Sequence, residues 1–388
     1  MVSQRVPPSR HGDDRLRRVV LTWLTTAQGG AERSTLELAR GLRELLGAEV
    51  ALVWWDGADH QPLPPVPGVR VWRAEDAASY ARALAGELRR DPDGTVLIGT
   101  HRTALVDIPV AEPLEVPVVS VLRGILVPGE RLRAADPATG LLVPRLPGDL
   151  DWTTLARATW VGVSRAATAS LARTSPHPVD AVTIYNGIAG AGRPKASAPR
   201  RPRRFAVVAR TEPWKRIDRV IQAFCAVPDR VSSRARLDIY GTGTALPLLR
   251  AQAKAAPARD IRFCGHVPAH RWQADADVLV SACDIEGFGR SVLEAGAAGI
   301  PQLVPDRGGS AELVLPGLTG LIHSGDEPGG LTAALTEAAC WSEQQLQALG
   351  RLAQLHARSY SQTRCFLAYA RLAQRVRACP GHSPGVHA

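Results

Sequence analysis

The chain has 388 residues, of which 45% are hydrophobic and 22% are charged, and its formal net charge is +10. This composition excludes an intrinsically disordered protein, and the length fits two domains of about 150 to 200 residues better than one. The positive excess lies beyond residue 190 without interleaved aromatic residues, which argues against a nucleic-acid-binding protein and suits a small anionic ligand.

The cysteines and the N-terminal region indicate a cytoplasmic protein. None of the six cysteines forms a Cys-x-x-Cys pair or has a histidine at zinc spacing, so we expect reduced thiols. The apolar run RVVLTWLTTA contains threonines and lacks a small-x-small cleavage site, so we expect a buried first strand and not a signal peptide. No apolar run reaches the roughly 18 residues of a membrane-spanning helix.

Strand-like and helix-like segments alternate along both halves of the chain. The strand-like segments of the first half are RVVLTWL, AEVALVWW, VRVWR, TVLIGT, VPVVSVL and ATWVGVS, and helical patterns such as ERSTLELARGLRELLG separate them. The alternation restarts in the second half with RRFAVVAR, ARLDIYG, IRFCG, DADVLVSA and PQLVP. Strands separated by helices predict parallel sheets covered on both faces. The sequence therefore predicts an α/β protein with two doubly wound, Rossmann-like domains facing each other across a cleft.

The domain boundaries follow from composition. We expect an N-terminal domain at residues 1–190, a basic, proline-rich linker at 191–204 and a C-terminal domain at 205–358. A C-terminal helix at 359–380 is expected to pack back towards the N-terminal domain, and the tail 381–388 is expected to be disordered.

The stretch DIEGFGRSVLEAGAAG predicts a strand, a glycine turn and a helix. Gly287 and Gly289 cannot both lie inside a helix, whereas Ser291–Ala298 is rich in helix-forming residues. The free N–H groups and positive dipole end of such a helix suit a phosphate or sugar hydroxyls. Glu286 would then lie at the mouth of a ligand site and Glu294 on the helix beside it. Two unrelated surface glutamates are the alternative.

Other turns also follow predicted strands, where the ligands of doubly wound sheets bind. Gly29 and Gly30 precede a helix that carries Glu32 near its start, which also fits a simple tight turn. In VVARTEPWKRID, Arg210 ends a strand and Lys215 opens a helix. Two fixed cations there form a clamp for a diphosphate, and two solvated cations are the alternative.

These motifs together resemble the retaining family 4 glycosyltransferases of the GT-B fold, also described as glycosyl transferases group 1. The resemblance is specific from about Ala206 to Ile322, where Glu286 and Glu294 match the family's E-x7-E element. Before residue 160 only the GGAE turn is a strong match. The motifs that carry it are QGGAE, VSRAATASL, YNGI, VARTEPWKRID, IYGTGTALPLL, IRFCGHV, EGFGRSVLEAGAAGIPQLV and GGSAELVLPGLTGLI.

The resemblance implies an enzyme that transfers a hexosyl group from a nucleotide sugar, most simply a UDP-sugar. It assigns Glu294 to the donor ribose, and it assigns Glu286 to the donor sugar together with the backbone N–H groups of Phe288 and Gly289. The remaining implied donor-binding residues are Gly29, Gly30 and Gly287. The N-terminal domain is implied to bind the acceptor and the C-terminal domain the nucleotide sugar.

The resemblance also implies the catalytic roles. Arg210 and Lys215 hold the diphosphate, where fixed cations stabilise the negative charge that grows on the leaving group. Neither a divalent metal nor another cofactor is then required. Family members are usually described as using front-face attack, in which the departing phosphate helps deprotonate the acceptor, so we expect no protein nucleophile. The alternative is that Glu286 and Glu294 form the acid/base pair of a hydrolase, but both residues match the family's ribose and sugar roles too specifically for that assignment.

The sequence departs from the family near one expected histidine. Family members commonly carry a histidine after an N-terminal strand, near the primary hydroxyl of the sugar. His101 in LIGTHRTALVD is our candidate for a catalytic role, with a purely structural imidazole as the alternative. Arg123 in VVSVLRGI stands where many relatives have histidine before glycine, and arginine cannot act as a base.

The acceptor is the least specified part of this reading. The charge balance of the first 190 residues favours a small soluble acceptor, neutral or cationic, such as an aminocyclitol or another secondary metabolite in antibiotic biosynthesis. A lipid-linked or capsular glycan acceptor is the alternative. Two other classes are a catalytically silent protein that binds a nucleotide sugar and a basic nucleic-acid-binding protein.

Overall fold

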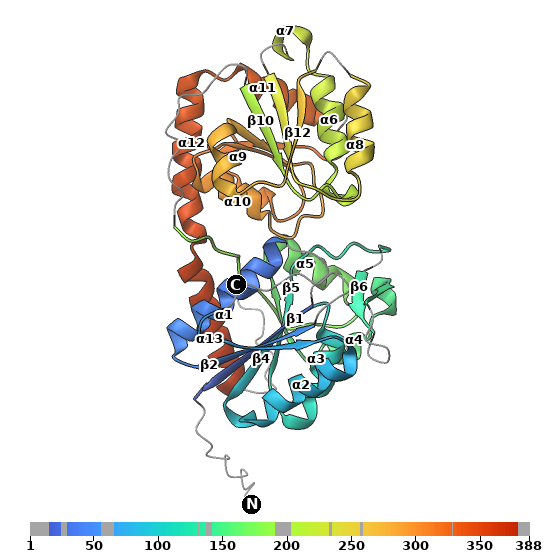
Figure 1. The fold of residues 1–388 in the computed structure, drawn as a ribbon, viewed down its shortest axis with the longest axis vertical. Helices are drawn as coiled ribbons and strands as arrows, with labels where there is room; N and C mark the ends of the chain where they lie inside the picture. Colours follow the sequence, from blue (N-terminus) through green and yellow to red (C-terminus); the bar gives the residue numbers. More distant parts are fainter. Residues whose placement is uncertain are drawn as a thin grey trace, which may run out of the picture.

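Two parallel β-sheets organise this computed structural model, one from each half of the chain (Figure 1). Helices lie between most of the successive parallel strands in each half, so the predicted α/β fold with two doubly wound domains is confirmed. The structure describes residues 15–24, 29–55, 66–130, 132–136, 142–190, 203–232, 235–256, 259–327 and 329–378.

The N-terminal sheet has seven parallel strands in the order β3-β2-β1-β4-β5-β8-β9. β1 lies inside the sheet and is buried along its whole length, as its continuous apolar sequence predicts. The strands are β1 (Arg18–Leu24), β2 (Glu49–Trp55), β3 (Arg70–Ala74), β4 (Thr95–Thr100), β5 (Val118–Leu122), β8 (Thr159–Gly162) and β9 (Ala181–Thr183). A separate antiparallel hairpin consists of β6 (Leu132–Ala135) and β7 (Leu142–Arg145).

The N-terminal helices begin and end where the sequence supplies caps. α2 begins with a capping box in which the Ser79 N–H donates to the Asp76 carboxylate at 2.6 Å. α1 ends at Gly47, whose φ of 59° is accessible to glycine without strain. The helices are α1 (Gly30–Leu46), α2 (Ala77–Arg89), α3 (Ala104–Ala111), α4 (Trp152–Leu155) and α5 (Arg165–Thr174).

The C-terminal sheet has six parallel strands in the order β12-β11-β10-β13-β14-β15. The strands are β10 (Arg203–Val208), β11 (Ala235–Tyr240), β12 (Ile261–Gly265), β13 (Val278–Val280), β14 (Gln302–Pro305) and β15 (Gly320–His323). The helices are α6 (Ile217–Cys225), α7 (Asp229–Ser232), α8 (Leu246–Lys254), α9 (Ala269–Asp275), α10 (Arg290–Ala297), α11 (Gly330–Cys340), α12 (Glu343–Ala357) and α13 (Gln362–Ala378).

Both sheets have a topological switch point, where successive strands are added on opposite sides of the first. It lies between β1 and β4 in the N-terminal sheet and between β10 and β13 in the C-terminal sheet. Ligands of doubly wound sheets bind in the crevice outside the carboxyl ends of strands at such a point. The segments that follow these four strands carry Gly29, His101, Arg210 and Glu286. The topology therefore positions four of the candidate residues.

The start of the C-terminal domain differs slightly from the expectation. β10 begins at Arg203, inside the expected linker 191–204, because the Arg203 side chain is buried and donates to the Trp341 carbonyl at 2.6 Å. The rest of that linker, residues 191–202, and the tail 381–388 lie outside the described residues.

The turn after β10 also differs from the expectation. β10 ends at Val208, two residues before Arg210, and Lys215 ends a 3-10 turn (Pro213–Lys215) instead of opening a helix. The left-handed conformation of Arg216, with φ of 52°, separates this turn from α6. Both cations consequently lie on an irregular segment.

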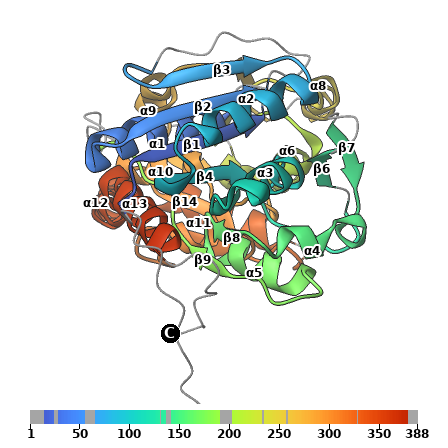
Figure 2. The ribbon, with the colours of Figure 1, turned by 90° about the horizontal axis from the view of Figure 1, so that it is seen from below.

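The last helix returns to the N-terminal domain. α12 and α13 run along one side of the molecule, and α13 lies beside α1 in both ribbon views (Figures 1 and 2). Backbone hydrogen bonds fix the start of α13, where the Gln362 N–H donates to the Ile188 carbonyl at 3.0 Å. Tyr369 and Ala373 are buried in the N-terminal core. The closest packing is at Gly41 of α1, which faces the Phe366 ring.

We predict that Gly41→Ala lowers stability by about 1–3 kcal/mol, because the added Cβ would lie 2.1 Å from Phe366 Cδ2 and overpack the α1–α13 contact. Gly86→Ala on α2 is the matched control. No atom lies near its added Cβ, so helix propensity alone should stabilise the protein by roughly 0.5–1 kcal/mol. Urea unfolding monitored by circular dichroism measures both. Equal stabilisation by the two substitutions would contradict the packing of α13 on α1.

Candidate functional site

Lys215 and Glu286 meet where β10 and β13 end. Lys215 Nζ donates a short hydrogen bond to Glu286 Oε2, and the two side chains are 13% and 22% exposed. The two residues belong to different turns of the C-terminal domain, so the ion pair joins the predicted diphosphate-binding segment to the predicted sugar-binding segment. Because both groups are mostly shielded from water, this pair is stronger than a surface ion pair.

Trp214 joins Lys215 and Arg210 to one aromatic ring. Lys215 Nζ lies 4.1 Å from the centroid of the Trp214 ring, and Arg210 Cζ lies 5.8 Å from it. Both distances fall within cation–π range. The indole is 37% exposed, which is unusual for tryptophan. The sequence interpretation missed Trp214, although a tryptophan directly before Lys215 was the available signal.

The glycine turn of the C-terminal domain lies directly against the N-terminal domain. A Cβ on Gly287 would lie 2.5 Å from the Arg123 carbonyl oxygen, and Ser164 Oγ donates to the Gly287 carbonyl at 2.6 Å. Gly289 has a φ of 91° and caps α10, a conformation that favours glycine. Phe288 between them turns its side chain into the core. The turn therefore presents backbone at the domain boundary.

Glu312 forms a second polar link between the domains. Its Oε1 accepts from the Ala166 N–H at 2.8 Å and its Oε2 from the Arg165 N–H at 3.1 Å, so it caps the start of α5. The Tyr185 hydroxyl donates to the same carboxylate at 2.6 Å. Glu312 lies within the GGSAELV motif, but its role was not predicted from the sequence. A residue that caps a helix of the other domain leaves no local pattern in the sequence.

Glu294 lies on α10 and is held by arginines of both domains. Its Oε1 accepts from Arg290 Nε at 3.1 Å and lies 3.6 Å from a terminal nitrogen of Arg33 on α1. A Cβ on Gly30 would lie 3.2 Å from Arg290 Cδ, so the start of α1 also lies against this helix. The structure thereby brings the GGAE turn and the E-x7-E element together.

Glu32 and His101 occupy the N-terminal side of the site. Burial raises the pKa of Glu32, and the nearby positive charges of Arg210 and Arg102 oppose that shift. Burial also lowers the pKa of His101 to about 3, with further lowering by Arg102 and Arg123, so the imidazole is neutral at physiological pH. Among the described residues, His101 makes no side-chain hydrogen bond to the C-terminal site residues, and its Nδ1 has no partner.

A buried carboxylate anchors the segment that carries His101. Asp107 of α3 accepts from Thr103 Oγ1 at 2.6 Å, from Thr22 Oγ1 at 2.7 Å and from the Tyr80 hydroxyl at 2.5 Å. Burial raises the pKa of Asp107 to about 6, and these hydrogen bonds act against the increase. The network ties the start of α3, directly after His101, to β1 and α2.

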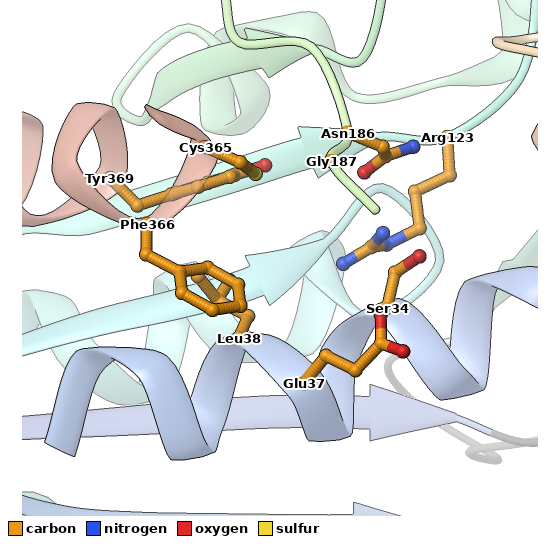
Figure 3. A pocket seen from close by; sticks show the side chains of 9 residues that line it. All are labelled: Ser34, Glu37, Leu38, Arg123, Asn186, Gly187, Cys365, Phe366 and Tyr369. Carbon is orange, nitrogen blue, oxygen red and sulfur yellow. The ribbon is translucent and has the colours of Figure 1, made fainter. Parts of the chain in front are cut away.

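The Arg123 side chain points into a small pocket between α1 and α13 (Figure 3). One terminal nitrogen donates to Thr35 Oγ1 at 3.0 Å, the guanidinium lies 5.4 Å from the Trp23 ring centroid, and burial lowers the pKa of Arg123. This placement separates Arg123 from the Lys215–Glu286 pair. The pocket is lined by Ser34, Glu37, Leu38, Arg123, Asn186, Gly187, Cys365, Phe366 and Tyr369.

The part of the chain that the structure describes has neither a metal-binding cluster nor a membrane-spanning helix. No group of three or more histidine, cysteine, aspartate or glutamate side chains there could hold a metal ion. No helix within the same ranges is long and apolar enough to span a bilayer.

Comparisons with known proteins relate the C-terminal half of the chain to one family. Residues 202–340 match the family model described as "Glycosyl transferases group 1". A GDP-mannose-dependent alpha-(1-6)-phosphatidylinositol monomannoside mannosyltransferase of Mycolicibacterium smegmatis is 33% identical over 33% of this chain and 36% of its own length. A glycogen synthase of Mycobacterium tuberculosis is 36% identical over 41% of this chain and 40% of its own length. The chain thus spans less than half the length of these relatives.

A solved structure extends the likeness to both domains. The Anabaena protein HepE, in complex with UDP-glucose, superposes with a TM-score of 0.70 at 17% identity, covering 92% of this chain and 98% of HepE. At that identity the likeness shows the fold alone. The expected GT-B fold is confirmed, and residues 202–340 match the expected family of glycosyl transferases group 1.

Proposed function

We propose that this chain is a retaining glycosyltransferase that moves a hexosyl group from a nucleoside-diphosphate sugar to a hydroxyl of a small soluble acceptor. The proposal rests on the Lys215–Glu286 pair, which lies directly before the glycine turn at Gly287, where the C-terminal domain meets the N-terminal domain. A cation, backbone N–H groups and a carboxylate at one boundary suit a diphosphate joined to a sugar.

The proposed catalysis is electrostatic. Lys215 and Arg210 would bind the diphosphate, and their attraction to it increases as the sugar–phosphate bond breaks and negative charge grows on the leaving group. The departing phosphate oxygen would accept the proton of the attacking acceptor hydroxyl on the same face of the sugar, so no protein nucleophile is involved. Glu286, released by Lys215 when the diphosphate binds, would accept hydrogen bonds from sugar hydroxyls.

The proposed donor is a UDP-sugar. HepE was solved with UDP-glucose, whereas the mycobacterial mannosyltransferase is named for GDP-mannose, so a GDP-sugar is the competing choice. A thermal-shift screen with UDP-glucose, UDP-N-acetylglucosamine, GDP-mannose and a dTDP-sugar tests the proposal. We expect one donor to raise the melting temperature well above the others. No shift with any of them would count against nucleotide-sugar binding.

The proposed acceptor is a hydroxyl-rich molecule, neutral or cationic, such as an aminocyclitol. Glu32 supports this choice, because a half-buried carboxylate near Arg102 and Arg210 can accept hydrogen bonds from hydroxyl or ammonium groups. A lipid-linked or polymeric glycan is the second candidate, favoured by the relatives named for phosphatidylinositol monomannoside and glycogen.

We predict that Lys215→Ala and Arg210→Ala each lower kcat by about 100-fold, the loss expected when one stabilising contact to a developing anion is removed. The Michaelis constant for the donor should change much less, because these contacts strengthen in the transition state. Lys254→Ala, at an exposed position of α8, is the control and should keep wild-type kinetics. A higher Michaelis constant at unchanged kcat would refute the transition-state role.

We predict that Glu294→Gln weakens donor binding roughly tenfold to a hundredfold. The substitution keeps the shape but loses a charge-assisted hydrogen bond worth about 1.5–3 kcal/mol. Calorimetric titration should show no such loss with a 2′,3′-dideoxyribose donor, because the analogue removes the same contact. An equal loss with both donors would show that Glu294 does not bind the ribose. Glu286→Gln should instead be insensitive to the missing ribose hydroxyls.

A further inference from the structure

Arg290 bridges the two domains within the candidate site. One terminal nitrogen donates to Ser34 Oγ at 2.8 Å and to Glu37 Oε2 at 3.0 Å, and the other donates to Glu37 Oε1 at 3.0 Å. Ser34 and Glu37 lie one turn apart on α1, whereas Arg290 opens α10. The Arg290 and Glu37 side chains are 14% and 15% exposed. A two-pronged, shielded arginine–carboxylate pair of this kind is both strong and geometrically specific.

The same guanidinium also contacts Glu294, one turn further along α10. In this contact, Arg290 Nε donates a hydrogen bond to Glu294 Oε1 at 3.1 Å. Among the described residues no hydrogen bond reaches Glu294 Oε2, and the side chain is 18% exposed. In this arrangement one oxygen of the proposed ribose-binding carboxylate is therefore available to a ligand.

Arg290 contacts one residue of its own helix and two residues of the other domain. Arg290 and Glu294 stay neighbours whenever α10 is folded, because residues four apart lie on the same helix face. Ser34 and Glu37 belong to the other domain, so separation of the domains removes their three hydrogen bonds to Arg290. The two freed terminal nitrogens can then turn to Glu294 and form a two-pronged pair that occupies both of its oxygens.

We propose that Glu37 is a positioning residue that draws the Arg290 guanidinium away from Glu294, so that Glu294 can bind the donor ribose only when α1 and α10 of the two domains are in contact. This inference rests on the proposed function, because it takes the ribose as the ligand of Glu294. Ser34 assists by accepting one further hydrogen bond. The side chains of Ser34 and Glu37 lie together with Arg123 at the edge of the pocket in Figure 3.

The alternative is that Arg290 only holds the domains together. The two hypotheses differ in the effect on nucleotide binding when Arg290 is substituted in addition to Glu37. If Glu37 protects Glu294 from Arg290, then Glu37→Ala leaves Arg290 free to block Glu294, and adding Arg290→Met removes the block. If Arg290 is a structural link only, the double variant binds no better than the single variant.

The test is calorimetric titration of full-length variants with UDP and with GDP. We expect Glu37→Ala to weaken binding of the preferred nucleotide about tenfold, which corresponds to about 1.4 kcal/mol. Glu37→Ala/Arg290→Met should recover to within about threefold of the wild type. Glu44→Ala, at an exposed position of α1, is the matched control and should bind like the wild type. A double variant that binds as weakly as Glu37→Ala, or more weakly, would overturn the proposal.

A second comparison keeps the test decisive if the double variant does not fold. The Glu37→Ala loss should disappear with 2′,3′-dideoxy-UDP or 2′,3′-dideoxy-GDP, because it acts through the contact of Glu294 with the ribose. A loss that persists with the dideoxy nucleotide would refute the positioning role. A wild-type protein that binds neither UDP nor GDP would instead refute the proposed function, and the two failures are thus distinguishable.

Discussion

The site depends on one close contact between backbones, at Gly287. The turn that carries this residue lies against the Arg123 carbonyl, which leaves no room for a side chain at Gly287, and its own carbonyl accepts a hydrogen bond from Ser164. Gly309 supports the turn from the other side, because a Cβ there would lie 2.2 Å from the Gly287 carbonyl oxygen. Because both positions are glycine, the domains approach closely enough for side chains of α1 and α10 to form hydrogen bonds with each other.

Both glutamates of the E-x7-E element are paired with cations in this arrangement. Glu286 is held by Lys215, and Glu294 is held by Arg290. These cations hold the carboxylates in one orientation and offset the cost of shielding them from water. Donor binding would then separate the Lys215–Glu286 pair, so that Lys215 binds phosphate and Glu286 binds sugar hydroxyls. Such an exchange of partners needs little reorganisation, which favours a preorganised electrostatic site.

The sequence was most informative where structure is local. Continuous apolar runs such as RVVLTWL predicted the buried strands, and the Gly287–Gly289 turn predicted the start of α10 within one residue. Contacts across the domain boundary could not be predicted, because Arg290 meets Glu37 over 253 positions of the chain. The Glu312 cap on α5 was missed for the same reason. The burial of Arg123 depends on α13, which returns from the far end of the chain.

Proton NMR of the protein incubated with UDP-glucose or GDP-mannose, with water as the acceptor, tests the proposed retaining transfer most directly. We expect slow release of the nucleoside diphosphate and a free sugar that first appears as the α anomer, the configuration of the donor. A sugar that first appears as the β anomer would contradict the retaining mechanism. No release from a donor that binds would contradict a catalytic role and indicate a nucleotide-sugar-binding protein.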